Sequence, residues 1–526
     1  MSAELAPAAP ATPPSGTPAP AATAGPVLGG DPGRARRTER RGWWGVAALT
    51  GLIALTWAPL LGAPFGDDHV GRIIGRYALH LRNLSEQGLL GSHLGADWAP
   101  YAATPYAHHP PLLNLLTAAG GLLPGDAGYQ VRLAPYLLAL LVVPAGAGLL
   151  RGLGIRWSAT LLALGMMAAT PFYWVHSPLM FDLAPILALS AAVVRLRGSP
   201  EPPRRLVVFA CVAGLLTTLV SWPGIAFAAA LGLWLLAARR VDRVTVLLGG
   251  SMLVGVLLSL GFVVGITGMD LLGEQAELRS TGGSYGVVRF LRRQWWFVSA
   301  LLPLWYLGAL CLGVLAGLLD RRTRGYLAMA TAFTLCWVLA LNNGAYVHSY
   351  WSYPVLVVGL VGMAALLDRL SGPLGARLPR RFAARSRVPA GLTPWTVAAT
   401  VIGSALAAYL CVVVLGPVKR ELVTEPGQAG RLAADHRPPP GQRYGWIAGS
   451  GVTTPRWLAY HWRLTPRTLT PPALGSGEAR ADDLVLMDMR LPPEWLPAGA
   501  LGQRAVARAG HYALFRAGDL RALAGV

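Results

Sequence analysis

Most residues in this 526-residue chain that could do chemistry gather in one stretch of its first half. Asp67 and Asp68 are adjacent carboxylates followed at once by His69, and His108 and His109 stand further along before a rigid Pro-Pro pair. A carboxylate can take a proton from a hydroxyl or hold a cation, and a histidine can hydrogen-bond to a phosphate. In an ordinary loop the aspartates would form a turn and a helix cap. Here they follow directly on an apolar segment in a chain with few acidic residues, which predicts a functional role.

Further candidate residues lie near the ends of later apolar segments. His176 and Asp182 flank the predicted outer ends of two segments, and an unpaired carboxylate there must find a partner or line a cavity; a helix cap is the alternative. His348 stands among aromatic residues, where interfacial anchoring explains the rings but not the histidine. We expect these three, with His69, to bind substrate. Arginines on the outer side favour a phosphate or an anionic lipid as partner. They are Arg279, Arg289, Arg292 and Arg293.

Metal binding is a weaker interpretation of the same histidines. His69, His108 and His109 with one aspartate would supply zinc ligands, but their spacing matches no helical or ribbon-type ligand pattern. The four cysteines all lie inside apolar segments. They are therefore predicted to be small buried side chains, not a disulfide or metal framework.

The elements that position these residues are predicted to be transmembrane helices. The chain is 54% hydrophobic and 13% charged. An ordinary soluble protein carries about twice that charge, so we expect a polytopic α-helical membrane protein. Apolar segments of bilayer length predict about 11–13 transmembrane helices. These segments cover 43–63, 133–150, 157–176, 181–197, 206–221, 223–238, 243–266, 295–319, 325–342, 347–368 and 394–416.

The pattern of charge predicts the orientation of the chain. The net charge is +20, but the arginines form short clusters between apolar segments, as in cytoplasmic loops, so nucleic acid is not expected as a partner. An arginine cluster just before the first span places the preceding residues in the cytoplasm. We expect residues 1–42 to be a disordered cytoplasmic tail. The transmembrane domain then covers 43–417 in the plasma (inner) membrane, with a first outer loop at 64–110. Residues 111–124 are apolar but short and bounded by prolines, which predicts a re-entrant or interfacial half-helix.

An amphipathic helix is predicted to follow the two aspartates. Its apolar residues recur at helical spacing, and its polar residues fall on the opposite face. Such a helix lies along the membrane surface, and the carboxylates at its N-terminus are favoured by the helix dipole. The apolar face holds Val70, Ile73, Ile74, Tyr77, Leu81 and Leu84, and the polar face holds Arg72, Arg76, His80, Arg82 and Asn83.

Residues 418–526 differ in kind from the rest of the chain. They are rich in Pro, Gly, Arg and Thr and contain short strand-like runs at 444–448, 483–487 and 511–515. A helix-like piece lies at 455–462. We expect a small soluble α/β domain on the extracytoplasmic face, because the last predicted span ends on that side.

The order of these motifs resembles the GT-C superfamily of polyprenyl-phosphate-sugar-dependent glycosyltransferases. Its protein O-mannosyltransferases and lipid A aminoarabinose transferases carry an Asp-Glu or Asp-Asp pair in the first outer loop. A His-Pro-Pro-Leu or Lys-Pro-Pro-Leu motif then precedes the next apolar helix. The matching residues here are Asp67-Asp68 and His109-Pro-Pro-Leu112. The resemblance covers 43–200 and, loosely, 340–365, and it does not extend to the C-terminal domain.

The resemblance implies an inverting transfer of a sugar from a polyprenyl-phosphate donor to an extracytoplasmic glycan, lipid or protein. Asp67 would be the general base and Asp68 its partner. His108 or His109 would meet the leaving phosphate or orient the substrate, and Arg132 or an outer-loop arginine would share the charge. Asp68 stands where glutamate is usual and the histidine is doubled, which leaves the acceptor and the working histidine open. Metal dependence differs among GT-C branches, so a divalent cation also stays open as a cofactor.

Two other classes of protein share some of these features. A transporter would also place Asp and His residues in a membrane, but it would carry an internal repeat and charges near mid-depth. The ionisable residues here are predicted to lie at the outer ends of the spans instead. A non-catalytic envelope scaffold, acting through its C-terminal domain, is the third class.

Overall fold

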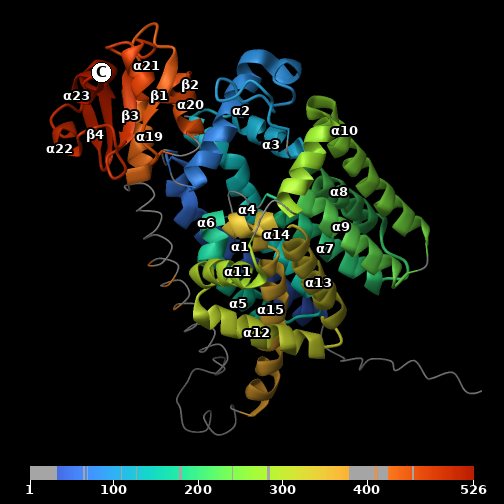
Figure 1. The fold of residues 1–526 in the computed structure, drawn as a ribbon. Helices are drawn as coiled ribbons and strands as arrows, with labels where there is room; N and C mark the ends of the chain where they lie inside the picture. Colours follow the sequence, from blue (N-terminus) through green and yellow to red (C-terminus); the bar gives the residue numbers. More distant parts are fainter. Residues whose placement is uncertain are drawn as a thin grey trace, which may run out of the picture.

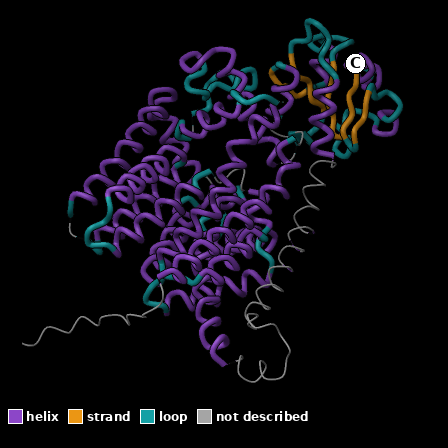
Figure 2. The backbone as a smooth tube through the Cα atoms, turned by 180° about the vertical axis from the view of Figure 1, so that it is seen from behind, coloured by secondary structure: helices purple, strands orange, loops and turns teal. Residues whose placement is uncertain are grey.

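The computed structural model describes residues 32–62, 65–67, 69–107, 109–125, 127–176, 181–239, 241–280, 285–377, 405, 409, 412, 425–452 and 455–526. A large helical part meets a small α/β domain at one end of the molecule (Figure 1). All strands of the described chain belong to that C-terminal domain (Figure 2). The predicted domain boundary at about residue 418 lies outside the described residues and stays a prediction.

The helical part runs from α1 to α15. Its elements are α1 (Pro32–Leu61), α2 (His69–Gly91), α3 (Leu112–Gly120), α4 (Ala127–Gly152), α5 (Trp157–Ala168), α6 (Pro171–His176), α7 (Leu183–Gly198), α8 (Arg204–Val220), α9 (Trp222–Leu236), α10 (Arg243–Ser280), α11 (Val287–Leu301), α12 (Leu304–Leu319), α13 (Arg324–Ala340), α14 (Asn342–Val347), the short 3-10 helix η2 (Ser349–Ser352) and α15 (Val355–Arg377).

Several of these helices suit a membrane. Three described helices are long and apolar enough to cross a bilayer, in Gly128–Gly152, Arg243–Asp270 and Ser349–Ser371. The nine-residue α3 is too short to cross a hydrocarbon core about 30 Å thick, as predicted for 111–124. The full count of spans stays a prediction, because the segment at 394–416 lies almost entirely outside the described residues.

One predicted span and one segment between predicted spans differ from the structure. The single span expected at 295–319 is wrong, because α11 and α12 are bent by 107° where Pro303 starts the second helix and cannot continue the first. The segment between the predicted spans at 243–266 and 295–319 is also partly helical. There α10 continues past a kink at Gly268, whose φ of 79° suits a residue without a Cβ.

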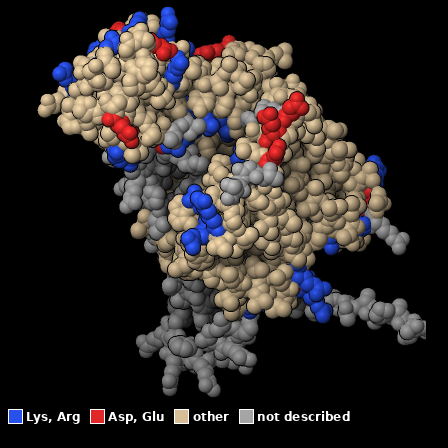
Figure 3. Space-filling view, viewed as in Figure 1, with Lys and Arg blue, Asp and Glu red and all other residues tan. Residues whose placement is uncertain are grey.

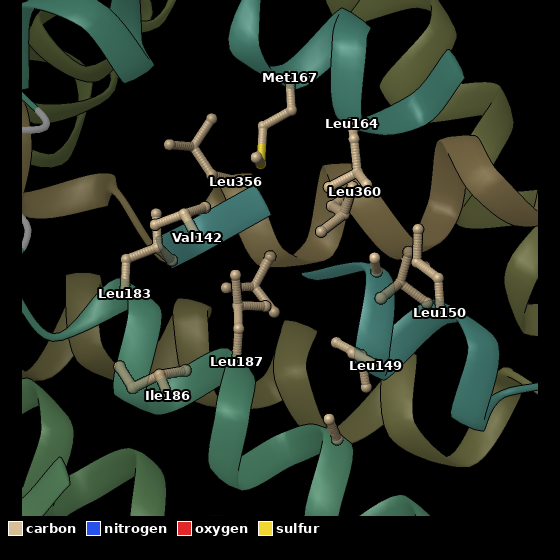
Figure 4. Close-up of a cluster of buried hydrophobic side chains, with 14 of the residues drawn as sticks. Val142, Leu149, Leu150, Leu164, Met167, Leu183, Ile186, Leu187, Leu356 and Leu360 are labelled. Atoms are coloured by element: carbon tan, nitrogen blue, oxygen red, sulfur yellow. The ribbon is translucent and has the colours of Figure 1, made fainter. Parts of the chain in front are cut away.

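The core of the helical part is apolar and closely packed. Leucine and valine side chains from α4, α7 and α15 meet in its centre, among them Val142, Leu187 and Leu360 (Figure 4). α12 and α15 approach through glycines, since a Cβ on Gly313 would lie 2.6 Å from the backbone carbonyl carbon of Gly362. Small residues allow this close contact between apolar helices.

A buried carboxylate joins three segments of the helical part. Asp368 of α15 accepts hydrogen bonds from Nε of Arg156, just before α5, and from Nη2 of Arg322, between α12 and α13, each at 2.8 Å. Because each arginine approaches a different oxygen, the carboxylate fixes the two turns against α15.

The C-terminal domain is a five-stranded mixed sheet with helices. Its strand order is β2-β1-β3-β5-β4, in which β1 pairs in parallel with β2 and β3, and β5 pairs antiparallel with β3 and β4. The three predicted strand-like runs are β1, β3 and β5, whereas the short edge strands β2 and β4 were not predicted. The elements are α19 (Glu425–Asp435), β1 (Tyr444–Ala448), α20 (Arg456–Trp462), β2 (Thr465–Thr468), α21 (Pro471–Gly475), β3 (Leu484–Asp488), α22 (Ala498–Leu501), β4 (Ala507–Ala509), β5 (Tyr512–Arg516) and α23 (Ala517–Ala524).

The helix α2 lies between the two parts of the molecule (Figure 1). Ile74, Tyr77 and Leu81 of its predicted apolar face are buried, and so are Arg76, His80 and Asn83 of its predicted polar face. The polar face is covered because α20 packs against α2, where a Cβ on Gly75 would lie only 2.7 Å from the backbone nitrogen of Trp457.

Candidate functional site

A cavity of about 660 Å³ lies where the C-terminal domain meets the helical part. We call it the site cavity. It is lined by residues of α2, the loop before α3, the α8–α9 junction, α10, the segment from α14 to η2, and the first residue of α20. Figure 3 shows basic side chains gathered at this junction, while much of the visible helical surface lacks charged side chains.

Four arginines line the site cavity. Arg72 and Arg76 come from α2, Arg279 from the end of α10, and Arg456 from the start of α20. Arg279 lies over the ring of Trp351, with 5.4 Å between its guanidinium carbon and the ring centroid. A cavity with this set of cations favours an anionic ligand, because guanidinium groups bind phosphate and carboxylate in defined directions.

Asp182 is the carboxylate that lines the site cavity. It stands just before α7 and is 3% exposed. Its Oδ2 accepts hydrogen bonds from the hydroxyls of Ser221 and Tyr353, which hold it in place. Asp182 was predicted to pair with other groups or to line a cavity, and it does both, whereas its role in binding substrate stays a prediction. The alternative of a helix cap is not observed, since its side chain makes no capping hydrogen bond.

Asp67 lies beside the site cavity and not among its lining residues. Its side chain is 2% exposed. Oδ1 accepts a hydrogen bond from Nε of Arg72 at 3.0 Å, and Oδ2 accepts one from the hydroxyl of Tyr512 at 3.2 Å. Tyr512 is the first residue of β5, so the C-terminal domain contacts the predicted general base directly.

The surroundings of Asp67 alter its basicity in opposite directions. Burial raises the pKa of Asp67 most strongly, and the hydrogen bond and charge of Arg72 and the hydroxyl of Tyr512 lower it. The net result is a raised pKa. A carboxylate whose pKa lies above its usual value is a better proton acceptor for general-base chemistry near neutral pH.

Two histidines of the predicted set line the site cavity. His109 is exposed, and its Nε2 lies 3.4 Å from the hydroxyl of Tyr106. His348 stacks on Tyr350, with ring centroids 5.0 Å apart. Both predicted histidines therefore reach the same cavity as Asp182, although they lie far apart in the sequence.

The remaining predicted site residues either do not line the site cavity or lie outside the described residues. Arg132 is a buried residue of α4 and does not line the site cavity. His69 begins α2, and His176 ends α6. Asp68 and His108 lie outside the described residues. Among the described residues there is no group of three His, Cys, Asp or Glu side chains that could hold a metal ion.

Sequence reasoning missed several residues of the site. Ser221, Tyr353, Arg456 and Tyr512 were not predicted, and Arg76 was assigned only to the polar face of α2. Hydroxyl side chains and single arginines carry little signal by themselves. A basic residue on an amphipathic helix was the one available indication, and its usual meaning is solvent exposure.

An apolar groove of about 420 Å³ lies next to the site cavity. Three helices each contribute two consecutive residues, one to the groove and one to the site cavity. The pairs are Leu112 and Leu113 of α3, Leu219 and Val220 of α8, and Phe262 and Val263 of α10. In each pair the first residue lines the groove and the second lines the cavity. The cavity that holds the four arginines thus borders a surface suited to a hydrocarbon chain.

Known proteins were compared with this chain. No protein-family model matches the sequence, and no curated protein matches it. Among solved structures, ArnT from Cupriavidus metallidurans bound to undecaprenyl phosphate has a TM-score of 0.56 at 16% identity, covering 90% of this chain and 98% of that chain. The apo state of ArnT gives 0.53 at 16% identity, with 92% and 99% covered. The archaeal oligosaccharyltransferase AglB from Archaeoglobus fulgidus scores only 0.49 at 13% identity, with 86% and 70% covered.

The likeness to ArnT spans nearly the whole of both chains, C-terminal domain included. The chain therefore shares its fold with ArnT, and the predicted resemblance to the lipid A aminoarabinose transferases is confirmed for the fold. Together with the apolar helices, this fold makes the chain an integral membrane protein.

Proposed function

We propose that the protein is an inverting glycosyltransferase that moves a sugar from a polyprenyl-phosphate donor to an extracytoplasmic acceptor. The observation that carries the proposal is the site cavity itself, in which four arginines and the buried Asp182 lie beside Asp67 in a GT-C fold. The protein acts in the plasma membrane, with its N-terminus in the cytoplasm and the site and C-terminal domain outside. Its acceptor is a glycan, a lipid or a protein.

The donor occupies the apolar groove and the site cavity together. The prenyl chain lies along the leucines of α3, α8 and α10, and the phosphate enters the neighbouring cavity, where Arg279 balances its charge. This arrangement fits the ArnT structure, which was solved with undecaprenyl phosphate bound. The half-helix α3 borders both spaces, which gives a reason for its short length.

Asp67 is the general base of the transfer. An acceptor hydroxyl or amine gives its proton to Asp67 and forms a bond to the anomeric carbon from the face opposite the phosphate. The bond from that carbon to the phosphate oxygen breaks, and the polyprenyl phosphate leaves with the electron pair. Arg72 lines the cavity and donates a hydrogen bond to Asp67, so it connects the carboxylate with the cavity. Asp182 and His348 bind hydroxyl groups of the substrates, and Asp68 acts as the partner of Asp67.

Sugar transfer by the purified protein in lipid nanodiscs tests this function. A panel of radiolabelled polyprenyl-phosphate sugars is supplied with envelope extract as the source of acceptor. We expect one donor to be consumed, and Asp67→Asn to reduce its consumption at least about a thousandfold, since a general base and its oriented proton transfer are lost together. Asp270→Asn removes an exposed acidic residue of α10 and should leave the rate unchanged. Donor consumption that persists in Asp67→Asn would refute the role of Asp67, and consumption of no donor would refute the function.

A further inference from the structure

We propose that Arg76 and Arg456 form a phosphate-binding clamp across the boundary between the helical part and the C-terminal domain. The proposal rests on the function given above and adds to it a binding role for the C-terminal domain. The ligand is a phosphate group, carried either by the polyprenyl donor or by a water-soluble phosphate on the acceptor side.

The first half of the clamp is Arg76, which is 6% exposed. Its guanidinium carbon lies 4.6 Å from the ring centroid of Tyr77 and 4.5 Å from that of Tyr106. Nη2 donates a hydrogen bond to the hydroxyl of Tyr77 at 2.7 Å, whereas Nε has no acceptor. Within the described part of the chain, Arg76 forms no ion pair with a carboxylate.

The second half of the clamp is Arg456, the first residue of α20. Its guanidinium carbon lies 5.3 Å from the ring centroid of Trp98 and 5.5 Å from that of Tyr101. Its Nε also lacks an acceptor, and no carboxylate among the described residues forms an ion pair with it. Burial lowers the pKa of Arg456, and the positive charge of Arg76 lowers it further, so the two cations repel each other.

The packing of α20 on α2 brings the two arginines together. Gly75 lets the backbone at Trp457 approach α2 directly, because a Cβ on Gly75 would lie 2.7 Å from the nitrogen of Trp457. Arg76 follows Gly75 in the sequence, and Arg456 precedes Trp457. The close contact therefore places one arginine of each domain beside the same cavity, and both line it.

Two desolvated cations facing one cavity are costly unless an anion lies between them. The aromatic rings around them give a weaker attraction than an anion does. A phosphate suits the arrangement, because its tetrahedral oxygens can accept hydrogen bonds from two guanidinium groups that approach from different directions. The free Nε atoms of Arg76 and Arg456 supply donors for this purpose.

Binding to the full-length protein in nanodiscs tests the clamp. The probes are undecaprenyl phosphate, undecaprenol as the lipid without charge, and inorganic phosphate, each followed by the shift in unfolding temperature and by microscale thermophoresis. The variants are Arg456→Gln, Arg456→Lys and the control Arg463→Gln. Arg463 lies at the other end of α20, is 70% exposed and pairs with Glu86.

We expect Arg456→Gln to weaken binding of the phosphate probe about tenfold or more, because it removes charge-assisted hydrogen bonds to the ligand. Arg456→Lys keeps the charge but not the planar fork and should fall between Arg456→Gln and the wild-type protein. Arg463→Gln should match the wild type. Should Arg456→Gln fail to fold, the lysine variant carries the test.

The pattern across the probes identifies the source of the phosphate. Loss of binding to undecaprenyl phosphate alone, with undecaprenol unaffected, assigns the clamp to the donor. Loss of binding to inorganic phosphate assigns it to a water-soluble group. Wild-type affinity for both phosphate probes in Arg456→Gln and Arg456→Lys would overturn the proposal. A wild-type protein that binds neither phosphate probe would also overturn it. The proposed function fails separately, because it requires consumption of a sugar donor, which these binding measurements do not involve.

Discussion

Replacing Tyr512 by phenylalanine tests whether the C-terminal domain tunes the general base. The substitution removes the hydroxyl that donates to Oδ2 of Asp67 at 3.2 Å and leaves the ring in place. Tyr512 is 2% exposed, so water does not readily replace the lost hydrogen bond. The carboxylate form of Asp67 then loses one of its donors, and the pKa of Asp67 rises further.

The size of this rise follows from the strength of the bond. A hydrogen bond to a charged group contributes about 1.5 kcal/mol at the weaker end of its range, which suits the length of 3.2 Å. One pKa unit corresponds to about 1.4 kcal/mol. We therefore expect the pKa of Asp67 to rise by about one unit in Tyr512→Phe. Asp67 must be deprotonated to act as a base, so activity is lost as the pH falls through its pKa. A higher pKa therefore moves the acid limb of the pH–activity profile to higher pH.

The measurement is the dependence of kcat/KM on pH, which reports the pKa of the free enzyme. Tyr512→Phe should lower kcat/KM about tenfold on the acid limb and leave it nearly unchanged at high pH. Arg72→Gln should move the limb further, because Arg72 lowers the pKa of Asp67 by both a hydrogen bond and a charge. Tyr444→Phe changes another tyrosine of the same domain, one whose ring meets that of Trp446 edge to face, and should have no effect.

Two results would refute this reasoning. A uniform loss of kcat/KM at every pH would mean that Tyr512 acts through packing alone. An acid limb that moves to lower pH would mean that the group which titrates is not Asp67.

Three further predictions concern stability. Asp368→Asn weakens the ion pairs with Arg156 and Arg322, so it should lower the unfolding free energy by about 2 kcal/mol and change the rate of sugar transfer little. An unchanged unfolding temperature would contradict the role of this carboxylate. Gly313→Val should lower stability by about 2–3 kcal/mol, because its Cβ would meet the backbone of Gly362. Gly308→Val on the same helix should be tolerated, because no atom lies within 4 Å of the Cβ it adds. Equal effects of the two substitutions would refute the packing argument. Burial and the charge of Arg82 lower the pKa of His461 to about 4. Below a pH of about 6.5 the unfolded chain therefore binds a proton at His461 that the folded chain does not bind. As a result, about 1 kcal/mol of stability is lost between pH 7.5 and 5.5. His461→Phe should remove that loss in thermal unfolding at the two pH values, and an equal loss in the variant would contradict the prediction.

Part of the site could be predicted from the sequence because a membrane restricts where charge can lie. Asp182 was expected to pair or to line a cavity, since a carboxylate at the end of an apolar segment has few other choices. The structure shows both. The short α3 was predicted for a similar reason, because an apolar segment bounded by prolines was too short to span.

The contacts between the two parts could not be predicted from the pattern of residues. Tyr512 and Asp67 are 445 positions apart, and no local periodicity relates them. The polar face of α2 gave a misleading signal for the same reason. An amphipathic pattern separates apolar from polar surroundings, but the polar side can be water or the surface of another domain. Here Arg82 donates a hydrogen bond to the backbone oxygen of Tyr460 in the C-terminal domain, and His80 contacts Asn114 of α3.

The bend at Pro303 was missed for a different reason. The residues on both sides are apolar, and the length of 295–319 matched a bilayer, so hydropathy alone indicated one straight span. A proline within a transmembrane helix is often tolerated. Whether it kinks the helix or ends it depends on the neighbouring helices, and α12 here packs along α15 after the bend.

The most direct test of the central claim is the configuration of the product. The transferred sugar is analysed by NMR for its anomeric configuration, and the lipid product is analysed by mass spectrometry from the same reaction. The proposed displacement predicts a product inverted at the anomeric carbon and one polyprenyl phosphate released for each sugar transferred. Retained configuration, or release of a lipid other than polyprenyl phosphate, would contradict a single displacement assisted by Asp67.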